Sequence, residues 1–335
     1  MVKAYQIDSF GLKNLKKSNF KLGQLAPDEV RVQLSAVSLN YRDLLMIKGH
    51  YNPRMPLPVI PVSDGAGTVV EVGSKIRQFK VGDRVCTTMI PDWSRGMPDA
   101  MIHKSTLGGP CDGCLAEYRD FHANEILPIP DRISFEEAAT LPVAGLTAYN
   151  ALQLIGRRKS AAVLLLGTGG VSLAGLGIAK RMGFDTIITS SSDTKLNQAK
   201  GLGADATINY KTHPNWSKEV KSYCPKGVDL VLEVGGSGTF DQSANSLSFG
   251  GKMALIGVLA ETGQTINLTK ILMYKIAVHG IIVGSRKDFQ NYLDFVKKTG
   301  ETPHIGEVLE GMDSIHKALE ILEEGSHFGK IVIRF

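Results

Sequence analysis

The chain has 335 residues, of which 43% are hydrophobic and 21% charged, which indicates an ordinary globular protein long enough for two domains. Its net charge is +5, and its lysines and arginines are scattered rather than clustered, so we expect no nucleic-acid partner. The sequence has four cysteines, no signal-peptide core and no apolar segment near the roughly 18 residues of a membrane-spanning helix, so we expect a cytoplasmic protein with no disulfide framework and no membrane partner.

Residues 1–126 are predicted to be rich in β-strands. The segments EVRVQLSAVSL and GAGTVVEVG carry β-branched residues in near-alternation, and FKVGDRVCTTM has the pattern of a strand entered through a Gly-Asp turn. Residues 91–113 show no sustained period and are predicted to form a long loop. Loops of this length in a compact domain are often functional.

The next segment, residues 134–155, has apolar residues at helical spacing. Ser134 followed by Glu137 predicts a capping box at the start of this helix. Pro142 lies inside the pattern and should break or kink the helix, because proline has no amide hydrogen to donate.

From residue 161 onward, strands are predicted to alternate with helices. AAVLLLG has the pattern of a buried strand, SLAGLGIAKRMG that of a helix, and TIITS, ATINY, VDLVLEV and KMALIGV those of further strands. This alternation predicts an α/β fold with a parallel sheet covered by helices on both faces. After residue 284 two more helices are expected, KDFQNYLDFVKK and MDSIHKALEILEEG, before a last strand, GKIVIRF.

The segment GTGGVS follows the first buried strand and opens a helix, which is the setting of a dinucleotide-binding loop. Its first glycine permits a tight turn, its second lets the backbone approach a pyrophosphate, and its third position needs only a small residue, which serine is. A turn that binds nothing is disfavoured, because the whole strand–helix series follows. The residues expected to hold the phosphates are Gly167, Thr168, Gly169, Gly170, Val171 and Ser172.

The choice between NAD and NADP depends on the end of the second strand, about 20 residues after the loop, where NAD enzymes place an acid. Here the sequence is TIITSSSDTKL, three serines followed by a lysine, which suits a 2′-phosphate. Asp193 is the competing NAD-type acid, but it lies past the strand end and has the position of a helix cap. We therefore favour NADP(H), with NAD less favoured. The residues expected to contact this end of the cofactor are Ser190, Ser191, Lys195 and, unless it is a core side chain, Tyr210.

Several motifs follow one another along the chain, among them SLNYRDLLMIKGHY, PVIPVSDGAGTVVEVG, LAEYRDF, SFEEAATLPVAGLTAYNAL, LGADATINY and GSHFGKIVI. In their order and spacing they together resemble the medium-chain dehydrogenase/reductase superfamily, above all its zinc-independent, quinone-oxidoreductase-like members. The resemblance implies a GroES-like β-rich catalytic domain at residues 1–126 and 284–335, interrupted by a Rossmann cofactor domain at residues 127–283. It also implies a cleft between the domains and a homodimer.

Zinc-dependent members of the superfamily supply metal ligands at three motifs that differ here. Asn40 and Asp43 stand in the segment that should hold the first cysteine, the triplet Val62-Ser63-Asp64 replaces Gly-His-Glu, and Val143 replaces the last cysteine. Asp64 alone cannot build a tetrahedral site, so no catalytic zinc is expected.

Cys111 and Cys114 have the spacing of half a zinc site, in the loop where the superfamily's structural zinc is bound. A zinc site completed by His103 and His122, a redox dithiol and two free cysteines all remain open, and we prefer free cysteines because a redox dithiol favours a helix N-terminus.

Without a metal, hydrogen-bond donors must stabilise the negative charge that develops on the substrate. This favours reduction of an enone, enal or quinone, in which the charge is delocalised. By resemblance, the catalytic candidates are Asn40 as a donor to the substrate oxygen, Tyr41 as a donor or proton relay, and Asp43, which can instead fix the loop or pair with Arg42. A purely structural turn is the alternative for the whole segment.

The resemblance also places further residues near the cofactor. Lys330 could assist a phosphate, or it could be a surface lysine without a role. The full set is Thr147, Gly257, Val258, Val283, Ser285 and Lys330.

The sequence therefore predicts an NAD(P)H-dependent, zinc-independent oxidoreductase. Two other functions stay open: an alcohol dehydrogenase that works without zinc, and a non-catalytic, crystallin-like or nucleic-acid-binding member of the superfamily.

Overall fold

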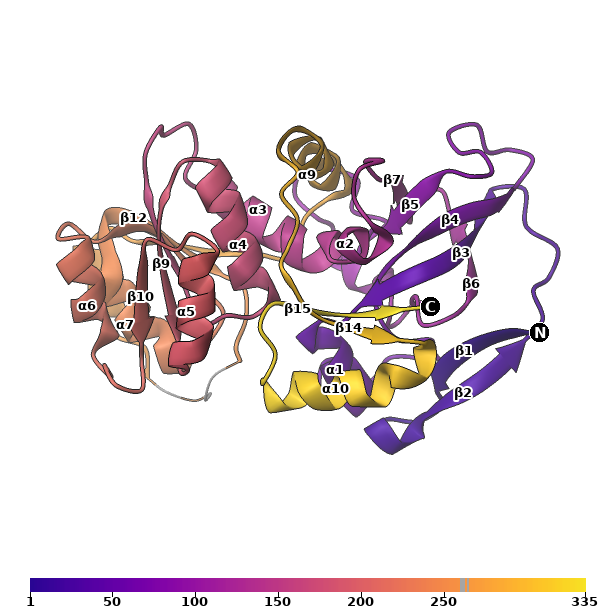
Figure 1. The fold of residues 1–335 in the computed structure, drawn as a ribbon, viewed down its shortest axis with the longest axis horizontal. Helices are drawn as coiled ribbons and strands as arrows, with labels where there is room; N and C mark the ends of the chain where they lie inside the picture. The colour runs from indigo at the N-terminus through magenta and orange to yellow at the C-terminus, as the bar shows by residue number, and fades with distance from the viewer. Residues whose placement is uncertain (260–262, 264) are drawn as a thin grey trace. The chain divides into compact units, whose positions relative to one another are not determined.

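The chain divides into two units in a computed structural model that describes residues 1–259, 263 and 265–335 (Figure 1). Unit 1 comprises Met1–Leu146 and Val283–Phe335, and unit 2 comprises Thr147–Ile282. Residues 127–146 were predicted to belong to the second domain, whereas in the structure they belong to unit 1. The reason is that helix α2 (Phe135–Ala139) packs on the sheet of unit 1.

Unit 1 is built on a seven-stranded, mostly antiparallel sheet. Its strands are β3 (Glu29–Ser38), β4 (Asp64–Val72), β5 (Arg84–Thr87), β6 (Tyr118–His122), β7 (Ile126–Pro128), β14 (Ile305–Glu310) and β15 (Lys330–Arg334). The order is β14-β15-β3-β4-β5-β7, with β6 also paired to β3. The unit further contains an antiparallel strand pair, β1 (Val2–Ile7) and β2 (Leu15–Phe20). Besides α2, its helices include α1 (Tyr41–Lys48), α9 (Arg286–Thr299) and α10 (Ile315–Glu324).

The apolar periodicity explains the core of unit 1. Strand β3 buries Val30, Val32 and Leu34, every second residue, which is the period of a strand. Helix α10 buries residues at helical spacing, and it packs against α1 and β15. These residues are Ile315, Ala318, Leu319, Ile321 and Leu322. Fully burying a large aliphatic side chain contributes about 1.5–3 kcal/mol.

Unit 2 is a parallel sheet with the strand order β10-β9-β8-β11-β12-β13. Its strands are β8 (Ala162–Leu165), β9 (Asp185–Ser190), β10 (Ala206–Asn209), β11 (Val228–Glu233), β12 (Leu247–Leu255) and β13 (Ala277–Gly280). Its helices are α3 (Leu146–Gln153, apart from its first residue), α4 (Gly170–Arg181), α5 (Asp193–Gly201), α6 (Trp216–Tyr223), α7 (Ser237–Ser246) and α8 (Leu268–Met273). The chain builds outward from β8 to β10, then crosses back to β11, so the order reverses between β8 and β11, where open α/β sheets bind their ligands. The predicted α/β fold is confirmed.

The helix expected at residues 134–155 is interrupted at Pro142, as predicted. Helix α2 ends at Ala139, a π-helical turn covers Leu141–Gly145, and α3 follows. The capping box is also present, since Glu137 N donates to Ser134 Oγ at 3.1 Å and Ser134 N donates to the Glu137 carboxylate at 2.7 Å.

Two observations bear on the environment of the protein. None of the helices in the described part of the chain is long and apolar enough to cross a membrane. The four cysteines are free thiols.

Candidate active site

The predicted site residues fall into one group in each unit. The first group surrounds the glycine loop of unit 2. Gly167 has φ +75°, a left-handed conformation that glycine adopts without strain, and Gly169 is the N-cap of α4. A Cβ added to Gly167 or Gly169 would meet no protein atom within 4 Å, so there is open space before the helix N-terminus. Free N–H groups facing open space fit the phosphates of a dinucleotide.

Ser172 stands where the third glycine of the motif usually stands. It is 2% exposed, and its Oγ donates to the Leu166 carbonyl oxygen at 2.6 Å, which ties the first turn of α4 to the end of β8. The close helix–strand contact falls further along α4, at Gly175, where an added Cβ would come within 2.9 Å of Leu232 and 3.0 Å of Leu165. The serine is therefore compatible with the loop.

The serines at the end of β9 and just after it lie around the start of α5. Ser190 is buried, and its Oγ accepts from Ser192 N at 3.3 Å. The cap of α5 is Ser192, whose Oγ accepts from Lys195 N at 3.4 Å, and not Asp193 as expected, because Asp193 is already the first helical residue. Burial lowers the pKa of Lys195.

Tyr210 follows the end of β10 and is 41% exposed. This exposure disfavours the alternative of a partly buried core tyrosine. Its backbone N donates to the Ser190 carbonyl oxygen at 3.1 Å, which places it beside the serines of β9.

Glu233, at the end of β11, is a buried carboxylate that the sequence analysis did not identify. It is 0% exposed and accepts hydrogen bonds from Gly235 N at 2.7 Å, Gly236 N at 3.0 Å and the hydroxyl groups of two α7 residues. Its carbonyl oxygen also accepts from Ile256 N and Gly257 N, which follow β12. Glu233 thus fixes the loops after two neighbouring strands, including the predicted positions Gly257 and Val258. The signal in the sequence that could have identified Glu233 is an acidic residue at the end of the apolar strand segment VDLVLE.

The second group lies in unit 1, at the start of α1. Asn40 is the N-cap, and its N donates to Asp43 Oδ2 at 2.8 Å. Asp43 is 0% exposed and also accepts from Ser63 N at 3.3 Å. Burial raises the pKa of Asp43, against the opposing charges of Arg42 and Lys330. These contacts give Asp43 the loop-fixing position that the sequence analysis offered as its alternative role, and Tyr41 is 40% exposed.

Lys330 joins this group from the start of β15. It is 3% exposed, so the surface-lysine alternative is wrong. Its Nζ donates to Asn40 Oδ1 at 2.6 Å and to the Leu39 carbonyl oxygen. Burial lowers the pKa of Lys330, and the nearby carboxylates of Asp64 and Asp43 only partly oppose this effect.

Asp64 is the other buried acid of the group. Its carboxylate accepts from Ser63 Oγ at 2.8 Å and from Val143 N at 3.2 Å. Burial raises its pKa to about 6, against the opposing charge of Lys330. The backbone just before Asp64 is strained, since Val62 has φ +72°, which a β-branched residue rarely adopts. Val62 stands where zinc-dependent members have the glycine of the Gly-His-Glu triplet.

The residues at the three zinc-ligand positions do not fit a catalytic zinc. Asn40, Ser63 and Val143 offer no thiolate or imidazole, and Asn40 Oδ1 is bonded to an ammonium group. Among the described residues, no group of three or more His, Cys, Asp and Glu side chains could hold a metal ion.

Cys111 and Cys114 do not form a reactive pair. Cys114 is fully buried with its Sγ 3.5 Å from the Ser63 carbonyl oxygen, while Cys111 Sγ is directed to the Lys104 carbonyl oxygen at 3.4 Å. Burial raises the pKa of both thiols, which disfavours the thiolate that a redox dithiol needs.

Of the other residues expected near the cofactor, Thr147 is buried at the start of α3, and Val258 is 65% exposed. Val283 has φ +45°, a strained left-handed conformation. Ser285 is buried as the N-cap of α9, where its Oγ donates to Asp288 at 2.6 Å. Its hydroxyl group is thus already engaged.

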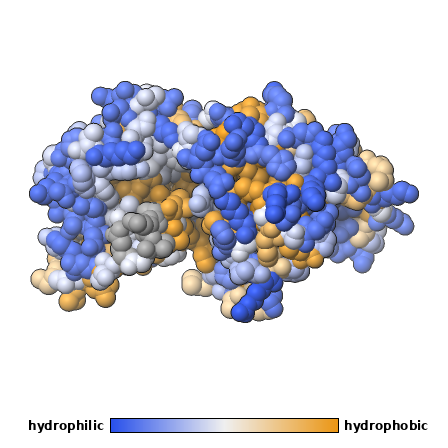
Figure 2. Space-filling view, turned by 90° about the horizontal axis from the view of Figure 1, so that it is seen from below, coloured by the Kyte–Doolittle hydropathy of each residue, from blue (hydrophilic) through white to orange (hydrophobic). Residues whose placement is uncertain are grey.

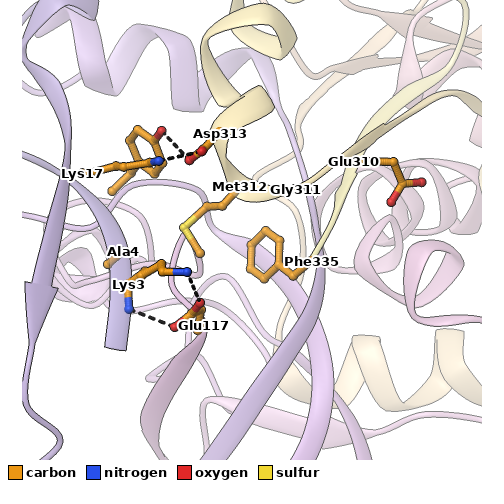
Figure 3. Close-up of a pocket in the computed structure, with 10 residues that line it drawn as sticks. Lys3, Ala4, Lys17, Glu117, Glu310, Gly311, Met312, Asp313 and Phe335 are labelled. Atoms are coloured by element: carbon orange, nitrogen blue, oxygen red, sulfur yellow. Dashed lines mark hydrogen bonds and ion pairs between the residues drawn. The ribbon is translucent and has the colours of Figure 1, made fainter. Parts of the chain in front are cut away.

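A pocket of about 400 Å³ lies elsewhere in unit 1, and none of the predicted site residues lines it. Figure 3 shows four of its charged side chains in two pairs: Lys17 with Asp313, whose atoms are 2.6 Å apart, and Lys3 with Glu117 at 3.6 Å. The fifth, Glu310, pairs with Arg334 outside the pocket. Since each of these charges has a partner, the buried Asn40–Lys330 group remains the candidate catalytic site of unit 1.

Comparisons with known proteins identify the family of the chain. Residues 26–131 match the family described as alcohol dehydrogenase GroES-like domain, and residues 170–298 match the family described as zinc-binding dehydrogenase. A zinc-type alcohol dehydrogenase-like protein of Schizosaccharomyces pombe is 39% identical, over 97% of this chain and 96% of that protein. A solved structure of an NAD-dependent alcohol dehydrogenase has a TM-score of 0.90 at 32% identity and covers 100% of both chains. An acryloyl-coenzyme A reductase of Metallosphaera sedula is 29% identical over 92% of each chain.

These matches confirm the resemblance and the two-domain fold, with a GroES-like unit 1 and a Rossmann unit 2. They also make the non-catalytic alternative wrong, because the relatives are oxidoreductases. The chain belongs to the medium-chain dehydrogenase/reductase superfamily and is an oxidoreductase that uses a nicotinamide cofactor.

Proposed function

We propose that this enzyme is an NADP(H)-dependent reductase that transfers hydride to a conjugated carbonyl or a quinone without a catalytic zinc. The observation that carries the proposal is the Asn40–Lys330 hydrogen bond of 2.6 Å in the segment where zinc-dependent relatives have their first ligand. An amide held by a buried ammonium group offers N–H donors instead of an anionic metal ligand. Bound nicotinamide would supply the hydride from its C4.

The roles of the catalytic candidates follow from their contacts. Asn40 Oδ1 is held by Lys330, so the donor left for a substrate oxygen is Nδ2, which would turn one hydrogen from its present partners, Ser63 Oγ at 3.5 Å and the Asp64 carboxylate. This amide would stabilise the negative charge that develops during hydride transfer. The exposed hydroxyl of Tyr41 would relay the proton, and Asp43 would position Asn40.

The substrate class follows from the strength of these donors. A neutral amide polarises a carbonyl less than a Lewis-acidic metal does, so a substrate that spreads its charge in an enolate or a hydroquinone suits it better than a simple alcohol. The relationship to an acryloyl-coenzyme A reductase, whose substrate is conjugated, supports this choice. The similarity to the solved structure of an NAD-dependent alcohol dehydrogenase supports the second candidate, an alcohol dehydrogenase that works without zinc.

The substrate experiment is an assay of NADPH consumption with quinones, enals and enones, beside NADP⁺ reduction with simple alcohols. We expect turnover of conjugated substrates by protein with no stoichiometric zinc in elemental analysis, and loss of most activity in Asn40→Ala. Preferred turnover of alcohols would support the second candidate. Stoichiometric zinc, or full activity of Asn40→Ala with a good substrate, would contradict the proposal.

The preference for NADP(H) is supported by the serines after β9 and by Lys195, whereas a carboxylate at the strand end would repel a 2′-phosphate. One similar structure is NAD-dependent, so the choice needs a direct test. Lys195→Ala should weaken binding of NADPH more than that of NADH. Equal weakening of both, or tighter binding of NADH by the parent protein, would refute the NADP assignment.

We further propose that the enzyme is a cytoplasmic homodimer. Four free cysteines are usual in a reducing compartment. Strand β13 is the end strand of its sheet in unit 2, and apolar side chains reach the surface of this unit (orange areas in the left half of Figure 2). Those on α8 are Leu268, Leu272 and Met273. Exposed apolar patches commonly mark interfaces. Light scattering should give twice the mass of one chain, and a monomer at micromolar concentration would contradict the dimer.

A further inference from the structure

The first carboxylate after strand β9 is Asp193, and in the structure it is hydrogen-bonded to a neighbouring strand. Asn209, the last residue of β10, donates from Nδ2 to Asp193 Oδ1 at 2.8 Å. The Asp193 side chain is otherwise at the surface, whereas Asn209 is only 9% exposed. The buried amide of Asn209 therefore holds the exposed carboxylate of Asp193.

The position of Asn209 is fixed by the fold. In the parallel pairing of β9 and β10, Asn209 lies in register with Ser190, at the carboxyl ends of both strands. Its Oδ1 accepts from Lys211 N at 3.0 Å, which sets the orientation of the amide and turns Nδ2 to Asp193. The Asn209 carbonyl oxygen accepts from His213 N at 2.9 Å, which anchors the following turn.

This arrangement bears on cofactor choice, because an acid near the end of the second strand of such a fold can bond the ribose 2′-hydroxyl of NAD. Asp193 is the acid in that region, and one of its oxygens is engaged by Asn209. We propose that Asn209 is a specificity-determining residue that favours NADP(H) by holding the Asp193 carboxylate on the β10 side, away from the 2′ position. This inference rests on the proposed function, of which it explains the cofactor preference.

Removal of the amide should free the carboxylate. An unheld Asp193 can move toward the ribose, where it would accept a hydrogen bond from the 2′-hydroxyl of NADH and repel the 2′-phosphate of NADPH. One charge-assisted hydrogen bond gained or lost corresponds to about a tenfold change in affinity, so the ratio of the two dissociation constants should shift toward NADH by about tenfold.

The test is a double-mutant cycle with Asn209→Ser and Asp193→Asn. A serine at position 209 is too short to reach Asp193 but can still accept from Lys211 N, so the turn is preserved. The Kd values of NADPH and NADH are measured by fluorescence titration of each purified full-length variant. Asn215→Ser, at the start of α6 in the same unit, is the matched control, and thermal unfolding checks that every variant is folded.

We expect Asn209→Ser to shift the Kd ratio toward NADH about tenfold, and the same substitution to leave the ratio unchanged when Asp193 is already Asn. A shift that persists in the Asp193→Asn background, or equal weakening of both cofactors, would show that Asn209 only supports the turn and would overturn the inference. An unchanged ratio in Asn209→Ser would overturn it too. A parent protein that prefers NADH would instead contradict the proposed cofactor, and the cycle would still report whether Asn209 and Asp193 are coupled.

Discussion

Replacing Lys330 by methionine removes the buried ammonium group of unit 1 while keeping most of the side-chain volume. The Nζ atom donates to Asn40 Oδ1 and to the Leu39 carbonyl oxygen. Burial raises the pKa values of Asp64 and Asp43, and the charge of Lys330 opposes this rise. Removing one partner from a buried charge pair generally costs about 3–5 kcal/mol, because the other charge is left uncompensated. We expect Lys330→Met to lower the free energy of unfolding of unit 1 by about this amount at pH 8.

The loss should depend on pH in a definite direction. In the parent protein the pKa of Asp64 is raised to about 6, and the charge of Lys330 opposes this rise. Without that charge, the pKa of Asp64 should rise further, so the folded variant holds a proton at pH values where the unfolded chain has lost it. The variant then continues to lose stability as the pH rises above 6, where the parent has stopped. The difference between the two proteins should therefore be larger at pH 8 than at pH 5.

The assay is urea unfolding at both pH values in a Trp216→Phe background, so that Trp93 of unit 1 is the fluorescent reporter. Lys48→Met is the control in the same unit, because Lys48 pairs with Glu323 at the surface and such pairs contribute at most about 1 kcal/mol. A loss below about 1 kcal/mol for Lys330→Met, or the same loss at pH 5 and pH 8, would refute the reasoning.

Three further substitutions test other parts of the structure. Glu233→Gln should destabilise unit 2 by about 1–3 kcal/mol, because the new amide cannot accept from all the donors around Glu233; a change in Trp216-monitored unfolding below about 0.5 kcal/mol would contradict this. Gly145→Ala should lower the melting temperature of unit 1 by several degrees, because the added Cβ would lie 2.5 Å from Oη of the fully buried Tyr292; an unchanged melting temperature would show that Tyr292 moves easily. Asp64→Asn should flatten the stability profile between about pH 4 and pH 6, because a carboxyl with a raised pKa makes the folded state less stable as the pH rises through that window; parallel profiles of variant and parent would contradict it.

The parts of the fold that were predicted from the sequence are those determined by residues close together in the chain. The period of the apolar residues identified all strands of unit 2 but one, the Ser134–Glu137 spacing identified the capping box, and the proline identified the interruption at Pro142. Strand β13 was not among the predicted strands, because none of its four residues is buried and it pairs with β12 alone. Local patterns also did not separate Ser192 from Asp193 as the cap of α5, since both residue types cap helices well.

The site was predicted less completely, because its contacts join distant parts of the sequence. Lys330 and Asn40 are 290 positions apart, and only the antiparallel pairing of β15 with β3 brings their strands together. The sequence identified both residues as candidates but not their hydrogen bond, and it left a surface position open for Lys330. Asn209 and Asp193 are 16 positions apart and meet because β9 and β10 are neighbours in the sheet, which no local pattern shows.

The balance of charge in the buried group of unit 1 explains why the missing zinc ligands need no other replacement. Arg42 and Lys330 supply two positive charges, and Asp43 and Asp64 supply two negative charges when ionised. A divalent ion placed among them would add two uncompensated positive charges in a buried position, which is strongly unfavourable. Zinc binding is therefore expected to require the loss of a cation, so if any simple variant gains zinc affinity, it should be one in which Lys330 is replaced by a neutral residue. The buried Lys330, and not only the absence of cysteines and histidines, therefore supports the proposed hydride transfer without a metal.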